Sequence, residues 1–252
     1  MKHFRTIRMW VIGAALFALR FYQNTHDFDN ETGLHTLSYA GIALVALIAV
    51  AVIAAFRISR RESWEKPPFN ENFSVPHTSL TPLITGIFLL AAGGALLAKN
   101  AFSSEFLVGS TSAANIASVA VAVLVILSAF CLLLLTRQMR RGSTPSLILV
   151  LPSMFFTAFW VLSLYLPSAN DPVLAHYCLP ILAAASAAYA FSQLAGFFRR
   201  ETAICSFLFM SECAVILCLA AAAELNVHSL LYLGCALIFT VFSVLQKPKT
   251  AK

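Results

Sequence analysis

Charged residues are scarce in this sequence. Only 11% of its 252 residues are Asp, Glu, Lys or Arg, whereas 60% are hydrophobic. A soluble domain usually has about 25% charged residues, so this composition, with a mean hydropathy of +0.82, excludes an ordinary soluble protein. We therefore predict an integral membrane protein whose first partner is the lipid bilayer.

Motifs for catalysis and cofactor binding are also missing. The sequence has no Walker P-loop, no GxSxG or HExxH motif and no CxxC pair. No lysine lies inside an apolar run, which excludes a retinal Schiff base, and no pair of mid-run histidines is present to ligate haem. We expect free cysteine thiols, no cofactor and no metal, and an integral-membrane enzyme ranks third among the functional classes.

Eight apolar runs are long enough to cross a membrane as helices. A hydrocarbon core of about 30 Å needs about 20 helical residues, and the runs lack the alternation of barrel strands. The sequence predicts an all-α polytopic integral membrane protein, a single transmembrane helical domain over residues 1–252 and a bundle of about eight transmembrane helices. The predicted spans are Ile7–Tyr22, Leu37–Phe56, Leu80–Ala98, Asn115–Thr136, Ser146–Leu166, Val173–Phe198, Thr202–Ala222 and Val227–Leu245.

The basic residues segregate between the predicted loops. When alternate loops are assigned to one side, fifteen of the seventeen Lys and Arg residues fall there, and only Arg20 and Lys99 fall on the other side. The positive-inside rule then places both termini in the cytoplasm, and we expect a bacterial cytoplasmic membrane. The net charge of +6 reflects this topology and anionic lipid head groups rather than nucleic-acid binding.

Two segments allow a second interpretation. The first run follows Lys2, Arg5 and Arg8 and is short, so it is either a retained span, which we favour, or a signal peptide. The polar, proline-containing loop Arg57–Ser79 is expected to be a loosely ordered connector. Its residues Arg57, Arg60 and Arg61 are also a candidate docking site for a cytoplasmic partner.

Glu212 is the one ionisable residue placed well inside an apolar run. Burying a charged acid at the centre of a span costs roughly 2.5–3.5 kcal/mol, so such acids are usually functional. We expect no cation at the same depth. The acid should therefore be neutral and hydrogen-bonded, with Ser211 next to it and Ser186 or Tyr189 facing it from the preceding antiparallel span.

Three roles suit such an acid. It could carry a proton or cation in a transporter, hydrogen-bond a quinone in an electron-transfer anchor, or clasp two helices together. We favour the first role. His176 joins the predicted ion- or substrate-binding set because Pro180, four residues later, bends the same helix.

A second group of ionisable residues lies on the predicted outer side. These residues could attract cations to that face. No short motif brings three or four of them together as metal ligands, so solvated loop charges are the better interpretation. The group consists of His26, Asp27, Asp29, Glu31, His35, Asp171, Glu224 and His228.

The leading interpretation is a small-solute or ion transporter, or permease, that uses Glu212 as a midplane acid. The alternative is a membrane anchor or interaction subunit of a larger complex, which could bind quinone. Either would work with a small solute, proton or cation, or with a cytoplasmic or membrane partner subunit, and neither involves nucleic acid.

Overall fold

The computed structural model describes residues 2–26, 39–62, 64–73, 80–104, 113–143, 145–168 and 174–246. These residues form eight long helices and no strand, as the sequence predicted for an all-α membrane bundle. The long helices are α1 (Lys2–His26), α2 (Tyr39–Ser59), α4 (Thr81–Ser104), α5 (Ala113–Arg140), α6 (Leu151–Ser168), α7 (Leu174–Gly196), α8 (Ile204–Ala221) and α9 (Ser229–Leu245). Short elements are α3 (Phe69–Asn72) and the 3-10 turns η1 (Leu147–Leu149), η2 (Phe197–Arg199) and η3 (Ala222–Glu224).

Six of the long helices are long and apolar enough to cross a membrane: α2, α4, α5, α6, α7 and α8. Helix α9 is apolar but has only 17 residues, and α1 carries four basic residues. The molecule is therefore an integral membrane helix bundle, and the number of eight spans stays a prediction.

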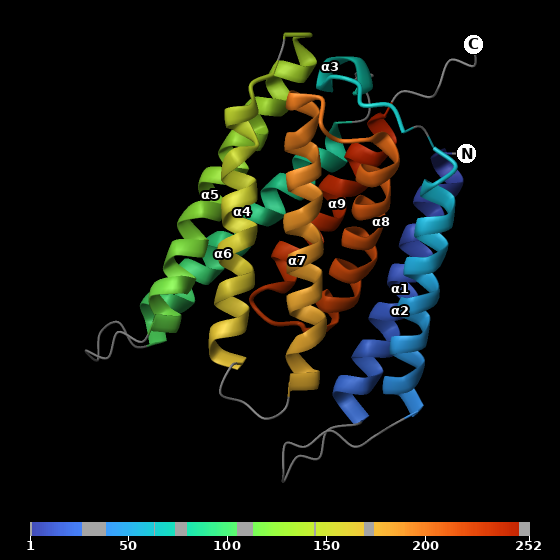
Figure 1. Cartoon of the computed structure of the whole chain (residues 1–252). Coiled ribbons are helices and arrows are strands. Elements are labelled where there is room, and N and C mark those ends of the chain that lie inside the picture. The colour runs from blue at the N-terminus through green and yellow to red at the C-terminus, as the bar shows by residue number, and fades with distance from the viewer. Residues whose placement is uncertain are drawn as a thin grey trace.

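The helices alternate in direction and close into a ring. Each helix from α4 to α9 packs against the next one along the chain, and α9 packs back against α4. Helices α1 and α2 lie outside this ring as a pair against α8 (Figure 1). Helix α8 is consequently the most buried of the six candidate spans, and α2 is the least buried.

Close backbone contact holds α9 against α4. A Cβ atom at Gly234 would lie 2.9 Å from the carbonyl oxygen of Gly86 and 3.0 Å from the backbone nitrogen of Leu90. Neither backbone atom can move without moving its helix. Glycine is therefore required here, and small residues serve the packing role that they commonly have in membrane bundles.

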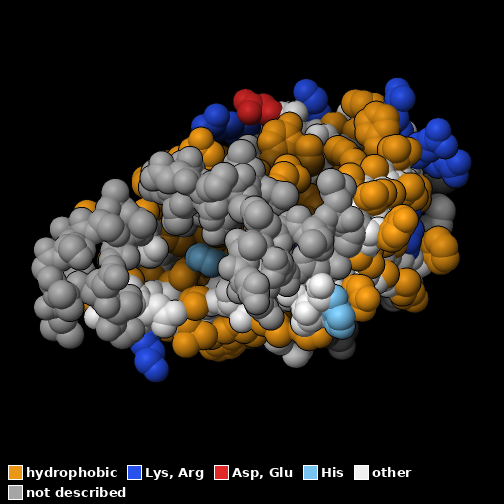
Figure 2. Space-filling model, turned by 90° about the horizontal axis from the view of Figure 1, so that it is seen from below, with side chains coloured by type: hydrophobic (Ala, Val, Ile, Leu, Met, Phe, Trp, Pro, Cys, Tyr) orange, Lys and Arg blue, Asp and Glu red, His pale blue; other side chains and the backbone are white. Residues whose placement is uncertain are grey.

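Aromatic side chains fill the interior of the ring. Trp160 of α6 packs on Tyr232 of α9 with ring centroids 4.7 Å apart, and Phe191 of α7 packs on Phe239 of α9 at 4.6 Å. All four side chains are fully buried. The flanks of the helices differ: large hydrophobic side chains such as Ile53, Val123 and Phe159 are exposed there, as a lipid-facing surface requires. Figure 2 looks onto the lower end of the bundle and shows hydrophobic side chains among the described residues around it.

The start of α1 and the end of α9 lie at the same end of the bundle, because Arg5 donates a hydrogen bond to the carbonyl oxygen of Ser243. We call this end the basic end, since Arg57, Arg140 and Arg199 also lie at helix ends there. The arrangement matches the predicted topology, and the cytoplasmic side of the termini remains a prediction.

Part of the loop Arg57–Ser79 is not a loosely ordered connector, which corrects the sequence-based interpretation. Phe69 and Phe73 are buried at the basic end, where Phe69 stacks on Phe198 and Phe73 contacts Phe197, Phe207 and Phe242. Phe73 also pairs with Gln246 through an antiparallel bridge. Burial of two aromatic rings fixes this stretch despite its polar neighbours.

Candidate functional site

Helix α1 supplies the cations of the candidate site because one of its faces is turned to α8. Met9, Gly13, Leu16 and Arg20 are buried at the three- and four-residue spacing of a single helix face. Arg5 continues this stripe by one turn toward the basic end. This stripe therefore faces α8 with an arginine at each end and apolar residues between them.

Arg5 and Arg8 both pair with Glu212 of α8. The guanidinium of Arg8 donates a short hydrogen bond to Glu212 Oε2, and Arg5 Nε lies 3.5 Å from Glu212 Oε1. The Glu212 side chain is fully buried, and those of Arg5 and Arg8 are 11% and 16% exposed. The expectation that no cation lies at the depth of Glu212 was therefore wrong, because the guanidinium groups of Arg5 and Arg8 both lie beside the acid.

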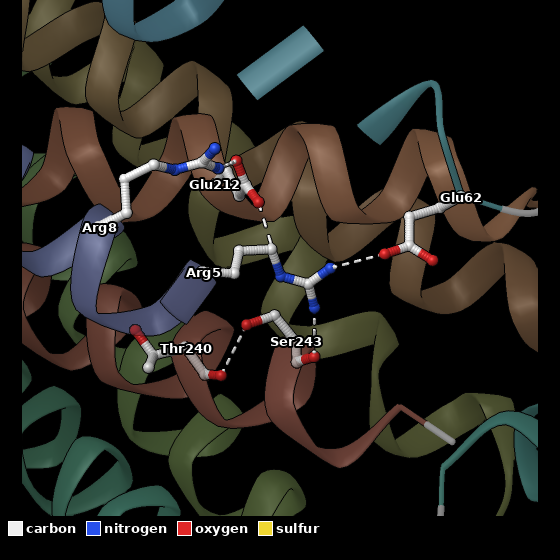
Figure 3. A network of polar contacts seen from close by, with 6 residues as sticks. All are labelled: Arg5, Arg8, Glu62, Glu212, Thr240 and Ser243. Atoms are coloured by element: carbon white, nitrogen blue, oxygen red, sulfur yellow. Dashed lines mark hydrogen bonds and ion pairs between the residues drawn. The ribbon is translucent and has the colours of Figure 1, made fainter. Parts of the chain in front are cut away.

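Arg5 is shared with a second acid. Its Nη1 lies 3.6 Å from Glu62 Oε1, nearly the same distance as its Nε from Glu212, and Glu62 follows the end of α2 (Figure 3). The Glu62 side chain is 42% exposed. The cluster thus leads from the solvated basic end, through Arg5, to a carboxylate that is closed off from solvent.

The cluster joins four elements of the bundle. Besides its two acids, Arg5 donates a hydrogen bond of 2.8 Å to the carbonyl oxygen of Ser243 in α9. One turn further along α1, Trp10 Nε1 donates to Thr240 Oγ1 at 3.2 Å. Helix α1 is therefore held to α8 and α9 by charge and hydrogen bonds as well as by packing.

Several buried polar atoms of the site have no hydrogen bond among the described residues. These atoms are Arg5 Nε, Glu212 Oε1 and Ser211 Oγ. Buried polar groups are normally hydrogen-bonded, and leaving one without a partner costs about 1–3 kcal/mol. The site is therefore closed and charged, and its hydrogen bonds are incompletely satisfied by the described residues.

Neither predicted partner of Glu212 from α7 forms a hydrogen bond or ion pair with it. The hydroxyl of Ser186 donates to the carbonyl oxygen of Ala183 in its own helix, and Tyr189 is 47% exposed. Ser211 is buried beside Glu212, as expected from its position. The side chain of His176 lies outside the described residues, so its predicted role is untested.

A matching pattern in the sequence could have revealed the arginine partners. Arg8 and Arg20 are twelve residues apart, and so are Glu212 and Glu224. In the structure, Arg20 Nη2 lies 3.1 Å from Glu224 Oε1, so both pairs join α1 to the α8 region with the same offset of 204 residues. The equal spacing of these charges fits both a parallel and an antiparallel pair of helices, and the observed pairs show that α1 and α8 run parallel and in register.

The predicted outer group is only partly described. Glu224 is taken by Arg20, and His228 Nδ1 accepts a hydrogen bond of 3.2 Å from Trp160 Nε1. His26 is exposed and stacks on Tyr22. Asp27, Asp29, Glu31, His35 and Asp171 lie outside the described residues, and no cluster of His, Cys, Asp or Glu able to hold a metal occurs within the described part of the chain.

The docking residues predicted at the end of α2 are exposed. Arg57 and Arg61 are both solvent-accessible, and the Arg60 guanidinium lies 5.3 Å from the centroid of the Phe56 ring. This exposure is compatible with docking and equally with ordinary head-group contact.

Fold and site together define an all-α integral membrane bundle with a buried arginine–glutamate cluster. The chain matches no protein-family model, no curated protein and no solved structure.

Proposed function

We propose that this protein is a permease for a small solute or ion in a bacterial cytoplasmic membrane, and that Glu212 is its ion-responsive group. The observation that supports this proposal is the shared position of Arg5, at 3.5 Å from buried Glu212 and 3.6 Å from partly exposed Glu62. Arg5 can therefore pair mainly with Glu212 or mainly with Glu62, and these two arrangements differ little in geometry.

The charge on Glu212 decides between these arrangements. An ionised Glu212 holds both Arg5 and Arg8 and fixes α1 against α8. A proton on Glu212, or a bound cation beside it, weakens both pairs and leaves Arg5 to Glu62. Removing one partner of a buried ion pair costs about 3–5 kcal/mol, which is enough to change the populations of two conformations.

The expected movement is a shift of α1 and α2 relative to the ring. These two helices contact the rest of the bundle mainly through α8, and α2 is the least buried candidate span. Release of Arg5 and Arg8 would open the interface at the basic end first, since Arg20 and Glu224 hold the other end. Binding of a proton or cation would thus change whether the interior of the bundle is accessible from the basic end.

Flux through reconstituted protein tests this function. We expect purified protein in liposomes to dissipate an imposed proton, Na⁺ or K⁺ gradient faster than empty liposomes. Glu212→Gln keeps the shape of the side chain but cannot ionise. Flux should therefore fall at least about tenfold, which corresponds to a free-energy difference of about 1.4 kcal/mol.

Glu71→Gln serves as the control, because Glu71 is an exposed acid at the same end of the bundle. It should retain the flux of the parent protein. Equal flux for the parent protein and empty liposomes, or undiminished flux in folded Glu212→Gln, would refute the permease function. The anchor or interaction subunit would then be the better proposal, with Arg57, Arg60 and Arg61 as its exposed surface.

A further inference from the structure

A separate groove opens at the basic end, away from the Glu212 cluster. It has a volume of about 140 Å³ and lies between the start of α6 and the end of α7. On the same measure, one water molecule needs about 10–15 Å³, so the groove can hold a group larger than water. One part of its wall is apolar, with Leu151 and Met154 on α6 and Ala195 on α7, and another part is polar.

The groove lies at the level where lipid head groups meet the hydrocarbon. The apolar stretch that includes α6 begins at Leu147, and the stretch that includes α7 ends at Arg199. Both residues line the groove. Its apolar wall therefore continues into the membrane, while its mouth lies at the basic interface.

Two opposite charges stand at this mouth. Arg199 and Glu201 both line the groove, and both are exposed. Neither side chain forms an ion pair with any residue that the structure describes. Ser192, on the α7 wall, adds a hydroxyl group.

The backbone holds the two charges in place. Phe197 is fully buried against Phe73 and Phe207, whereas Arg199, two residues later, is exposed. Arg200 adopts a left-handed conformation with φ 58°, and the Glu201 amide donates to the carbonyl oxygen of Gly196 at 3.0 Å. This tight helix ending fixes Glu201 beside the last turn of the helix.

We propose that this groove binds a phospholipid whose head group carries both a phosphate and a primary ammonium, as phosphatidylethanolamine does. Arg199 receives the phosphate, Glu201 receives the ammonium, and the wall of Leu151 and Met154 covers the start of an acyl chain. A purely anionic lipid would meet repulsion from Glu201. A choline head group cannot donate hydrogen bonds to a carboxylate, so it loses that contact.

Competition between lipids tests this site. The delipidated full-length protein in detergent is mixed with equal amounts of phosphatidylethanolamine, phosphatidylglycerol and phosphatidylcholine of identical acyl chains, and bound lipid is counted by native mass spectrometry. We expect phosphatidylethanolamine to exceed each of the others by about tenfold, because one charge-assisted hydrogen bond distinguishes it.

Three variants make the test specific. Glu201→Gln should remove the preference for phosphatidylethanolamine over phosphatidylglycerol, whereas Arg199→Gln should reduce binding of all three lipids. Arg200→Gln is the matched control, since Arg200 is the adjacent exposed cation and does not line the groove; its lipid binding should equal that of the parent protein. Thermal unfolding of each variant in detergent confirms that the bundle is intact.

Two results would overturn the proposal. One is a lipid preference that follows negative charge alone, with phosphatidylglycerol bound best. The other is an equal effect of Arg199→Gln and Arg200→Gln, which would show that the basic end attracts lipids without a defined groove.

Discussion

At the scale of single residues, the buried cluster is held by charge balance. Arg5 and Arg8 bring two positive charges to α1, and Glu212 and Glu62 bring two negative charges to the facing elements. None of the three mostly buried groups would be stable there alone, because an unpaired buried charge costs several kcal/mol. The network therefore explains how α1 tolerates arginines at this depth.

Replacing Glu212 alone should destabilise the protein. Glu212→Leu leaves Arg5 and Arg8 without their shared partner, and we expect the free energy of unfolding to fall by about 3–5 kcal/mol. The measurement is the denaturant or thermal unfolding midpoint in detergent.

Replacing all three buried charges should reverse this loss. In Arg5→Met, Arg8→Met, Glu212→Leu, an apolar contact takes the place of the cluster, and such exchanges are often neutral or stabilising. The charge-balance explanation fails if the single variant is as stable as the parent protein, or if the triple variant recovers nothing.

At the scale of elements, the bundle depends on two kinds of helix contact. Helices α4 and α9 approach each other closely at Gly86 and Gly234, where a Cβ atom at Gly234 would meet the backbone of α4. Helices α1 and α8 meet through paired charges at both ends and a tight apolar middle, where a Cβ at Gly13 would clash with the side chain of Leu219. Both contacts depend on a glycine, and the second depends on paired charges as well.

The α4 and α9 contact leads to a clear prediction. In Gly234→Ala the added methyl group would lie within 3.0 Å of two backbone atoms of α4, so the helices must separate. Overpacking of this kind typically costs about 1–3 kcal/mol. Ala95→Val, which adds volume at an exposed position of α4, should leave the unfolding midpoint unchanged. An equal midpoint for both variants would contradict the close contact.

At the scale of the whole molecule, one end carries most of the positive charge and holds both the start of α1 and the end of α9. The Glu212 cluster, the buried rings around Phe69 and Phe73, and the groove lined by Arg199 and Glu201 all lie toward this end. If the basic end faces the cytoplasm, as the positive-inside rule predicts, every site proposed for this protein is approached from the cytoplasmic side.

Cysteine labelling tests this orientation. In a cysteine-free background, Asn226→Cys places a thiol in the exposed turn at the end opposite to the basic end, and Arg200→Cys places one at the basic end. A membrane-impermeant maleimide added to intact cells should modify the first variant and leave the second unmodified until the cells are opened. The reverse labelling pattern would show that the basic end faces the outside. Both proposed sites would then be approached from the outside.

The positions of the long helices could be predicted from the sequence because hydrocarbon imposes a strict requirement on every crossing segment. The predicted run Val227–Leu245 became α9 at Ser229–Leu245, and Thr202–Ala222 became α8 at Ile204–Ala221. Glu212 could be singled out for the same reason, since an acid in such a run is costly. Helix ends, composition and charge segregation are all local properties of the chain.

Only the tertiary structure decided which helices lie side by side and which charges meet. Arg8 and Glu212 are separated by 204 residues, and their only sequence signal is the twelve-residue spacing that Arg8 shares with Arg20 and Glu212 shares with Glu224. The docking of Phe69 and Phe73 onto the basic end likewise depends on rings from α8 and α9 and from η2. Apolar runs are interchangeable in lipid, so they do not indicate which helix packs against which. The sequence by itself determined that the helices form and where they lie along the chain. Close packing and charge pairing in the tertiary structure determined how the helices are arranged.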